Sequence, residues 1–190
     1  YARARRHYER GFLLWTICEN ELNGSFTATN LALLHSSHGE SYEAARWGRL
    51  AYRLSRRSGN AVGVRIIHLM NGDEAMREGR LDAARANYEK ALRFEIAGET
   101  PHFRGSVLRR LGSLLRRTGN LDEALTLHRE ALELAVETGE QRMQAFAVIE
   151  VGEDLRRLAA FDDATTTLVD GVQRASMLGL DPLLNEGLLA

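Results

Sequence analysis

One spacing, of 40 residues, organises almost the whole of this chain. Four segments of similar sequence align without a gap, at residues 39–44, 79–84, 119–124 and 159–164, and each ends in alanine. Small residues recur at the same spacing ahead of these segments, at Ala32, Gly72, Gly112 and Gly152. Bulky apolar residues recur behind them, at Tyr52, Leu92, Leu132 and Val172. A spacing kept three times in succession is the signature of a repeat array.

Each repeat predicts two helices joined by a tight turn. In the third repeat, mostly apolar residues lie on one face at helical spacing: Leu121, Ala124, Leu125, His128, Ala131, Leu132 and Ala135. Residues 107–115 mark a preceding helix, and Gly119 follows it where a left-handed C-cap favours glycine. The chain is rich in good helix formers and holds only two prolines. We therefore expect an all-α fold built of antiparallel helix hairpins.

Two spaced patterns resemble the signature of tetratricopeptide repeats: Leu111-Gly112…Ala124-x-x-x-His128-x-x-Ala131 and Gly72…Ala84-x-x-x-Tyr88-x-x-Ala91. The resemblance covers essentially the whole chain. The usual period of that family is about 34 residues, so the chain is similar to the long-period type found in kinesin light chains and in the sensor arrays of bacterial ATPase-type transcription activators. HEAT and armadillo repeats also have periods near 40 residues, but we see no reason for their small-residue columns to match. The resemblance implies a right-handed superhelical solenoid.

The repeat columns divide the chain into one continuous array. We expect a second helix of a truncated repeat plus a linker at 1–24, four repeats at 25–64, 65–104, 105–144 and 145–184, and the start of a further repeat at 185–190.

By resemblance to the family, the first helix of each hairpin lines a concave groove that binds peptides or helices. Transferring the groove columns selects Leu69, Asp73, Arg77, Arg109, Ser113, Arg116, Arg117, Ile149, Glu153, Arg156 and Arg157 as ligand-binding candidates. The arginines at 77, 117 and 157 recur at the repeat spacing, and such a row would bind carboxylates or phosphates. In the alternative interpretation these arginines only complement helix C-terminal dipoles in solvent.

We find no catalytic, metal or cofactor site in the sequence. His35 and His38 lie three residues apart, but no carboxylate or cysteine follows at a spacing that would complete a metal site. Cys18 is the sole cysteine, which excludes an internal disulfide and fits a cytoplasmic location, and we interpret it as a buried structural thiol. No acid–base or nucleophile pair converges, so we expect a binding protein and not an enzyme.

The charge pattern argues against nucleic acid and membranes as direct partners. The formal net charge is −1, and no apolar run of about 18 residues could cross a bilayer. The basic cluster of Arg3, Arg5, Arg6 and Arg10 is interpreted as a solvated helix face, with nucleic acid as the second choice.

We expect a protein–protein interaction module, part of a larger bacterial multidomain regulator, that binds an acidic peptide or protein in the groove. The alternative is a sensor array that binds a small effector or signalling peptide and controls an attached transcription-activator ATPase. Apolar residues near both ends predict self-association through uncapped surfaces. They are Phe12, Leu13, Leu14 and Trp15 in the first helix, and Leu183, Leu184, Leu188 and Leu189 in the last segment.

Overall fold

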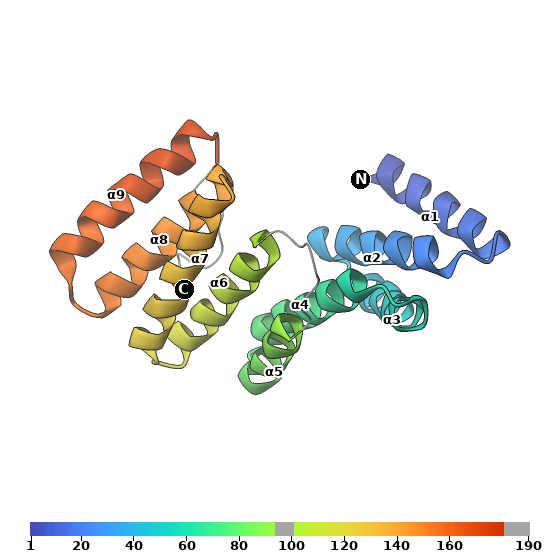
Figure 1. The fold of residues 1–190 in the computed structure, drawn as a ribbon, viewed down its shortest axis with the longest axis horizontal. Coiled ribbons are helices and arrows are strands. Elements are labelled where there is room, and N and C mark those ends of the chain that lie inside the picture. Colours follow the sequence, from blue (N-terminus) through green and yellow to red (C-terminus); the bar gives the residue numbers. More distant parts are fainter. Residues whose placement is uncertain (94–100, 181–190) are drawn as a thin grey trace. The chain divides into compact units, whose positions relative to one another are not determined.

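The structure is a computed structural model that describes residues 1–93 and 101–180. Within those ranges it contains nine helices and no strand (Figure 1). The helices are α1 (Ala2–Ile17), α2 (Glu21–Ser37), α3 (Ser41–Ser58), α4 (Ala61–Arg77), α5 (Leu81–Leu92), α6 (His102–Arg117), α7 (Leu121–Glu137), α8 (Gln141–Arg157) and α9 (Phe161–Met177). The all-α fold expected from the sequence is confirmed. No helix in these ranges is both long and apolar enough to cross a membrane.

A left-handed residue follows eight of the helices in the described residues, at a spacing of 20 positions except for the 40 between Gly79 and Gly119. Six are glycines, at 39, 59, 79, 119, 139 and 179, with φ between 64° and 84°, and they include Gly119, for which the sequence predicts this conformation. Glycine adopts this conformation without steric cost. Glu19 and Ala159 occupy the same position with φ of 52° and 61°. Their β-carbons make the conformation less favourable, by about 1–2 kcal/mol, so the hairpin geometry holds these two turns in place.

The chain forms two compact units, Tyr1–Ala97 and Gly98–Ala190. In unit 1, α2 pairs with α3 and α4 with α5, and α1 packs against α2. In unit 2, α6 pairs with α7 and α8 with α9. The second helices α3, α5, α7 and α9 start at 41, 81, 121 and 161, at the 40-residue period. The first helices start at 21, 61, 102 and 141, a few residues before the expected repeat starts, and the 185–190 segment lies outside the described residues. The division into repeats remains a prediction.

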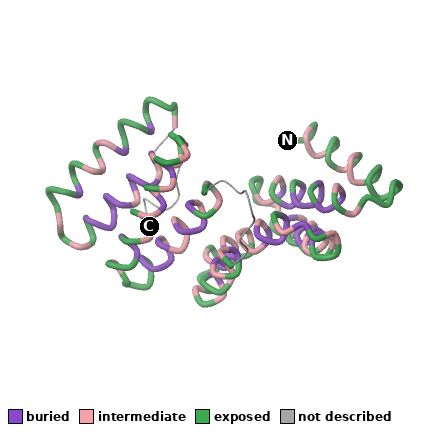
Figure 2. Tube along the Cα trace, in the orientation of Figure 1, coloured by how far each residue is buried: buried purple, intermediate pink, exposed green. Residues whose placement is uncertain are grey.

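The small-residue column packs against a bulky side chain of the partner helix. A β-carbon on Gly72 would lie 2.4 Å from the Tyr88 ring, and one on Gly112 would lie 2.6 Å from the His128 ring. At Gly152 the contact is with Leu168, at 2.7 Å. At these three positions the residue is therefore small because the second helix inserts a bulky side chain there. The buried residues follow the facing sides of the paired helices in both units (Figure 2).

Helix α1 differs from the others because none of its residues is buried. Phe12 makes an edge-to-face contact with Trp47 at 5.2 Å, whereas Leu13 and Ile17 are 62% and 78% exposed. Cys18 is exposed, so the interpretation as a buried thiol is wrong. The reason is local, because Cys18 is the C-cap residue of α1 and lies just beyond the end of that helix. The leucines expected at the other end lie outside the described residues.

Candidate functional site

Arg116, one of the candidate groove residues, lies in the interior of unit 2. Its side chain is 6% exposed. It forms an ion pair with Glu150 and donates a hydrogen bond to Asp154 at 3.2 Å, both on α8. It also donates to the backbone carbonyl of Glu150 at 3.4 Å. Arg116 therefore joins α6 to α8, and its charge is compensated within the fold.

His128 extends this network to α7. Neither His128 nor Asp154 has any exposed side-chain surface, and Nδ1 of His128 contacts the Asp154 carboxylate. On the other side of the ring, Nε2 lies 3.0 Å from the backbone carbonyl of Arg109. Both ring nitrogens thus face oxygen atoms, one on α8 and one on α6. These two contacts hold the buried ring between α6 and α8.

Glu150 is the second carboxylate of the network. Arg109 donates to it at 3.1 Å, and the Ser113 hydroxyl lies 3.5 Å from the same oxygen. Burial acts to raise the pKa of Glu150, but the charges of Arg116, His128 and Arg109 and the hydrogen bond from Arg116 outweigh it, so the pKa lies below its usual range. The carboxylate is therefore favoured in the folded state.

This lowered pKa predicts that acid destabilises unit 2. A group whose pKa is lower in the folded than in the unfolded state stabilises the fold above its unfolded pKa, about 4.3 for glutamate. That contribution is lost as the pH falls from there through the folded value. Urea unfolding of the wild type across this range should show a progressive loss of stability. Glu150→Gln should be less stable than the wild type near neutral pH and lose less on acidification. An equal loss in both proteins would contradict the assignment.

A second group of arginines is exposed at the C-terminal turns of α6 and α8. Arg117 is exposed, and the side chains of Arg156 and Arg157 are 53% and 36% exposed. Both α8 arginines bind Glu153, with N–O distances of 2.7 Å and 3.1 Å. The hydrogen bond from Arg156 is the main cause that lowers the pKa of Glu153, which is itself mostly buried. Three guanidinium groups and one recessed carboxylate thus lie at the C-terminal turns of α6 and α8.

Nearer the N-terminus of α8, Phe146 contacts two arginines. The guanidinium carbon of Arg109 is 5.8 Å from the ring centroid, and that of Arg142 is 5.7 Å away. Both distances are in the range of cation–π contacts. Residues 142, 146, 153 and 157 recur at helical spacing, so they share one side of α8. We call these side chains, together with Arg109, Arg117 and Arg156, the α6–α8 basic face.

The remaining candidates are placed elsewhere. Ile149 is 3% exposed and packs into the core of the α8–α9 hairpin, close to Gly171. Three further candidates lie on α4 in unit 1: Leu69, Asp73 and Arg77. Leu69 is half-buried, Asp73 accepts a hydrogen bond from the Tyr88 hydroxyl at 2.9 Å, and Arg77 pairs with Glu74.

Glu150 and Asp154, the counterions of the network, are not among the residues predicted from the sequence. A signal was present, because the column that contains Asp154 holds leucine in two other repeats, at Leu34 and Leu114. A carboxylate in such a column, four residues from another carboxylate, indicates a buried charge that needs a partner.

Residues 103–175, which span most of the two unit 2 hairpins, match the tetratricopeptide repeat family. This part of the chain is similar to tetratricopeptide repeats. Among solved structures, it is similar to BtubC (BKLC) from P. vanneervenii, with 22% identity and a TM-score of 0.71 over 86% of this chain and 68% of that one. At this identity the likeness shows the fold alone, and it confirms the all-α repeat solenoid. A search of curated proteins found no match. Tetratricopeptide repeats are in general protein–protein interaction modules.

Proposed function

We propose that the chain binds an acidic peptide or protein segment on the α6–α8 basic face, without catalysing a reaction. The supporting observation is the division of the arginines in unit 2. Arg116 is buried and neutralised by Glu150 and Asp154, whereas Arg117 and Arg156 stay at the surface. Exposed guanidinium groups bind carboxylates in a bidentate manner.

The same face offers an apolar contact beside the charges. Phe146 is half-buried, with Arg109 and Arg142 over its ring. Aromatic and arginine side chains are the residues that contribute most of the binding energy in protein interfaces. A partner with an apolar residue next to acidic ones would therefore complement this face. We place such a module within a larger cytoplasmic regulator, with self-association through the exposed residues of α1 as a second proposal.

Charge reversal on this face should abolish the preference for acidic partners. In a selection of random displayed peptides on the purified chain, the wild type should enrich sequences rich in Asp and Glu. Arg156→Glu/Arg157→Glu should lose that enrichment, because the face then repels carboxylates.

A matched control makes this test specific. Arg129→Glu/Arg174→Glu changes the net charge equally but lies on the second helices α7 and α9, at exposed positions. It should enrich the same peptides as the wild type. If both double variants lose the acidic peptides equally, only the overall charge matters and the proposed face is wrong. Circular dichroism confirms that each variant keeps its helices.

A further inference from the structure

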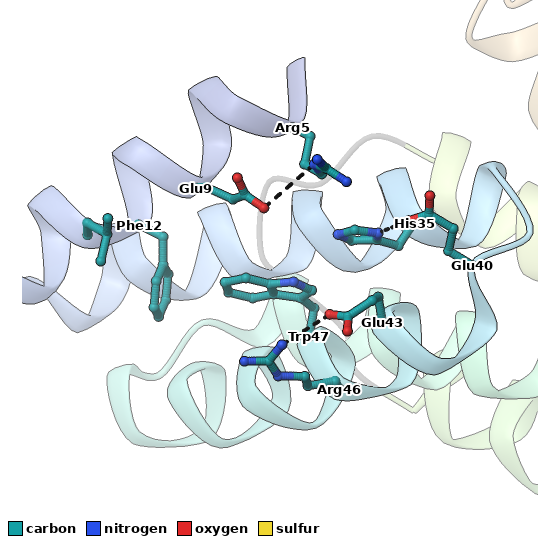
Figure 3. Close-up of a pocket in the computed structure, with 9 residues that line it drawn as sticks. Arg5, Glu9, Phe12, His35, Glu40, Glu43, Arg46 and Trp47 are labelled. Atoms are coloured by element: carbon teal, nitrogen blue, oxygen red, sulfur yellow. Dashed lines mark hydrogen bonds and ion pairs between the residues drawn. The ribbon is translucent and has the colours of Figure 1, made fainter. Parts of the chain in front are cut away.

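Unit 1 contains a pocket of about 540 Å³ among α1, α2 and α3 (Figure 3). Its lining residues are Arg5, Glu9, Phe12, Leu13, His35, Glu40, Glu43, Arg46 and Trp47. Phe12 and Trp47 form an aromatic wall, with the two rings edge to face. The volume is in the range of small-molecule sites, about 300–1,000 Å³.

The charges around this pocket are already paired. Nε of Arg5 lies 3.7 Å from the Glu9 carboxylate, within ion-pair distance but too far for a hydrogen bond, and both residues belong to α1. Arg46 pairs with Glu43 at 3.2 Å on α3. An ionic ligand would therefore have to displace an existing pair, whereas a neutral ligand would not.

Two polar atoms of the lining lack a hydrogen-bond partner among the described residues. They are Nε2 of His35 and Nε of Arg5, and both are buried. His35 is only 3% exposed, and in Figure 3 its unbound ring nitrogen points away from Glu40, toward the space beside Trp47. A buried polar atom without a hydrogen-bond partner is unfavourable, so a ligand group that pairs with both atoms would gain free energy on binding.

The contacts of His35 indicate what this group must be. Nδ1 of His35 contacts the Glu40 carboxylate, which also accepts a hydrogen bond from the Tyr1 hydroxyl. A carboxylate accepts only, so Nδ1 carries the proton, and Nε2 of the neutral ring is left as an acceptor. Nε of Arg5 is a donor. The complementary group therefore donates one hydrogen bond and accepts another.

We propose that this pocket binds a small neutral ligand that carries a carboxamide on an apolar or aromatic body. The amide N–H donates to Nε2 of His35, the carbonyl accepts from Nε of Arg5, and the body packs against Phe12 and Trp47. Arg5 is 41% exposed and turns aside to admit the ligand, a side-chain change common on binding. The site lies in unit 1, separate from the α6–α8 basic face.

The fluorescence of Trp47 reports on binding directly. The chain has two tryptophans, so Trp15→Phe leaves Trp47 as the only one, inside the pocket lining. Three probes share one aromatic body: 3-phenylpropanamide, 3-phenylpropionate and 3-phenylpropylamine. The amide should change the fluorescence in a saturable way, with a Kd at least about 10-fold lower than that of either ion. No saturation, or equal binding of the three probes, would overturn the proposal.

Variants of the two polar atoms complete the test. In the Trp15→Phe background, His35→Leu should weaken amide binding by at least about 10-fold. The same substitution at His7, an exposed residue outside the pocket lining, should leave it unchanged. If His35→Leu loses its helical circular dichroism signal, the amide affinity is measured in Arg5→Met instead. That substitution removes the proposed donor from a side chain that is 41% exposed, so the fold should tolerate it. Unchanged amide affinity in the deciding variant would refute the assignment.

Discussion

Asp154→Ala is expected to destabilise the chain by about 3–5 kcal/mol, the usual cost of breaking a buried ion pair from one side. Asp154 has no exposed side-chain surface and contacts both Arg116 and His128. The substitution leaves the buried Arg116 guanidinium with Glu150 as its remaining carboxylate partner, and the His128 ring loses its contact at Nδ1. The desolvation cost of the guanidinium then remains, while much of the attraction that offset it is gone.

Urea unfolding followed by circular dichroism measures this effect. The matched control is Asp170→Ala, which removes an aspartate from an exposed ion pair with Arg174. Exposed pairs of this kind stabilise by about 0–1 kcal/mol. Equal losses in the two variants would show that Asp154 does not hold a buried network.

The second large effect is expected at Gly112. A β-carbon there would lie 2.6 Å from Nε2 of His128. The ring cannot give way easily, because Asp154 and the carbonyl of Arg109 hold its two nitrogens. Overpacking of a core typically costs about 1–3 kcal/mol, which offsets the helix propensity gained by replacing glycine with alanine, about 1 kcal/mol. Gly112→Ala should therefore lower the unfolding free energy by up to about 2 kcal/mol.

Gly48 supplies the control for this substitution. It is also a buried helical glycine, but the nearest atom to an added β-carbon is Cδ1 of Ile67, at 4.0 Å. Gly48→Ala should raise the stability by about 0.4–1 kcal/mol. Thermal unfolding of the two variants should give shifts of opposite sign, and a stabilising Gly112→Ala would contradict the packing account.

Much of the fold could be predicted from the sequence because the repeat columns encode packing. Gly112 and His128 stand in columns that recur every 40 residues, and the structure brings these two residues into contact. The left-handed turns were predictable for the same reason, since glycine marks most of them. Glu19 and Ala159 show the limit of that signal, because the hairpin imposes the conformation there without glycine.

The site was less predictable because neighbouring helix residues point in different directions. Arg116 and Arg117 differ by about 100° around the helix, so the two could not share one face. The family columns selected both, and only Arg117 is exposed. Which arginine is buried depends on Glu150 and Asp154, which lie 34 or more residues away. The unit 1 pocket depends in the same way on side chains from three helices.

The measurement that tests the proposed function most directly is an NMR titration of the chain with an acidic peptide enriched in the selection. Chemical-shift changes should gather on α6 and α8, around Phe146, Arg156 and Arg157, and should be absent from Arg156→Glu/Arg157→Glu. Changes confined to α7 and α9, or unchanged in that variant, would contradict the assignment of partner binding to the first helices of the hairpins.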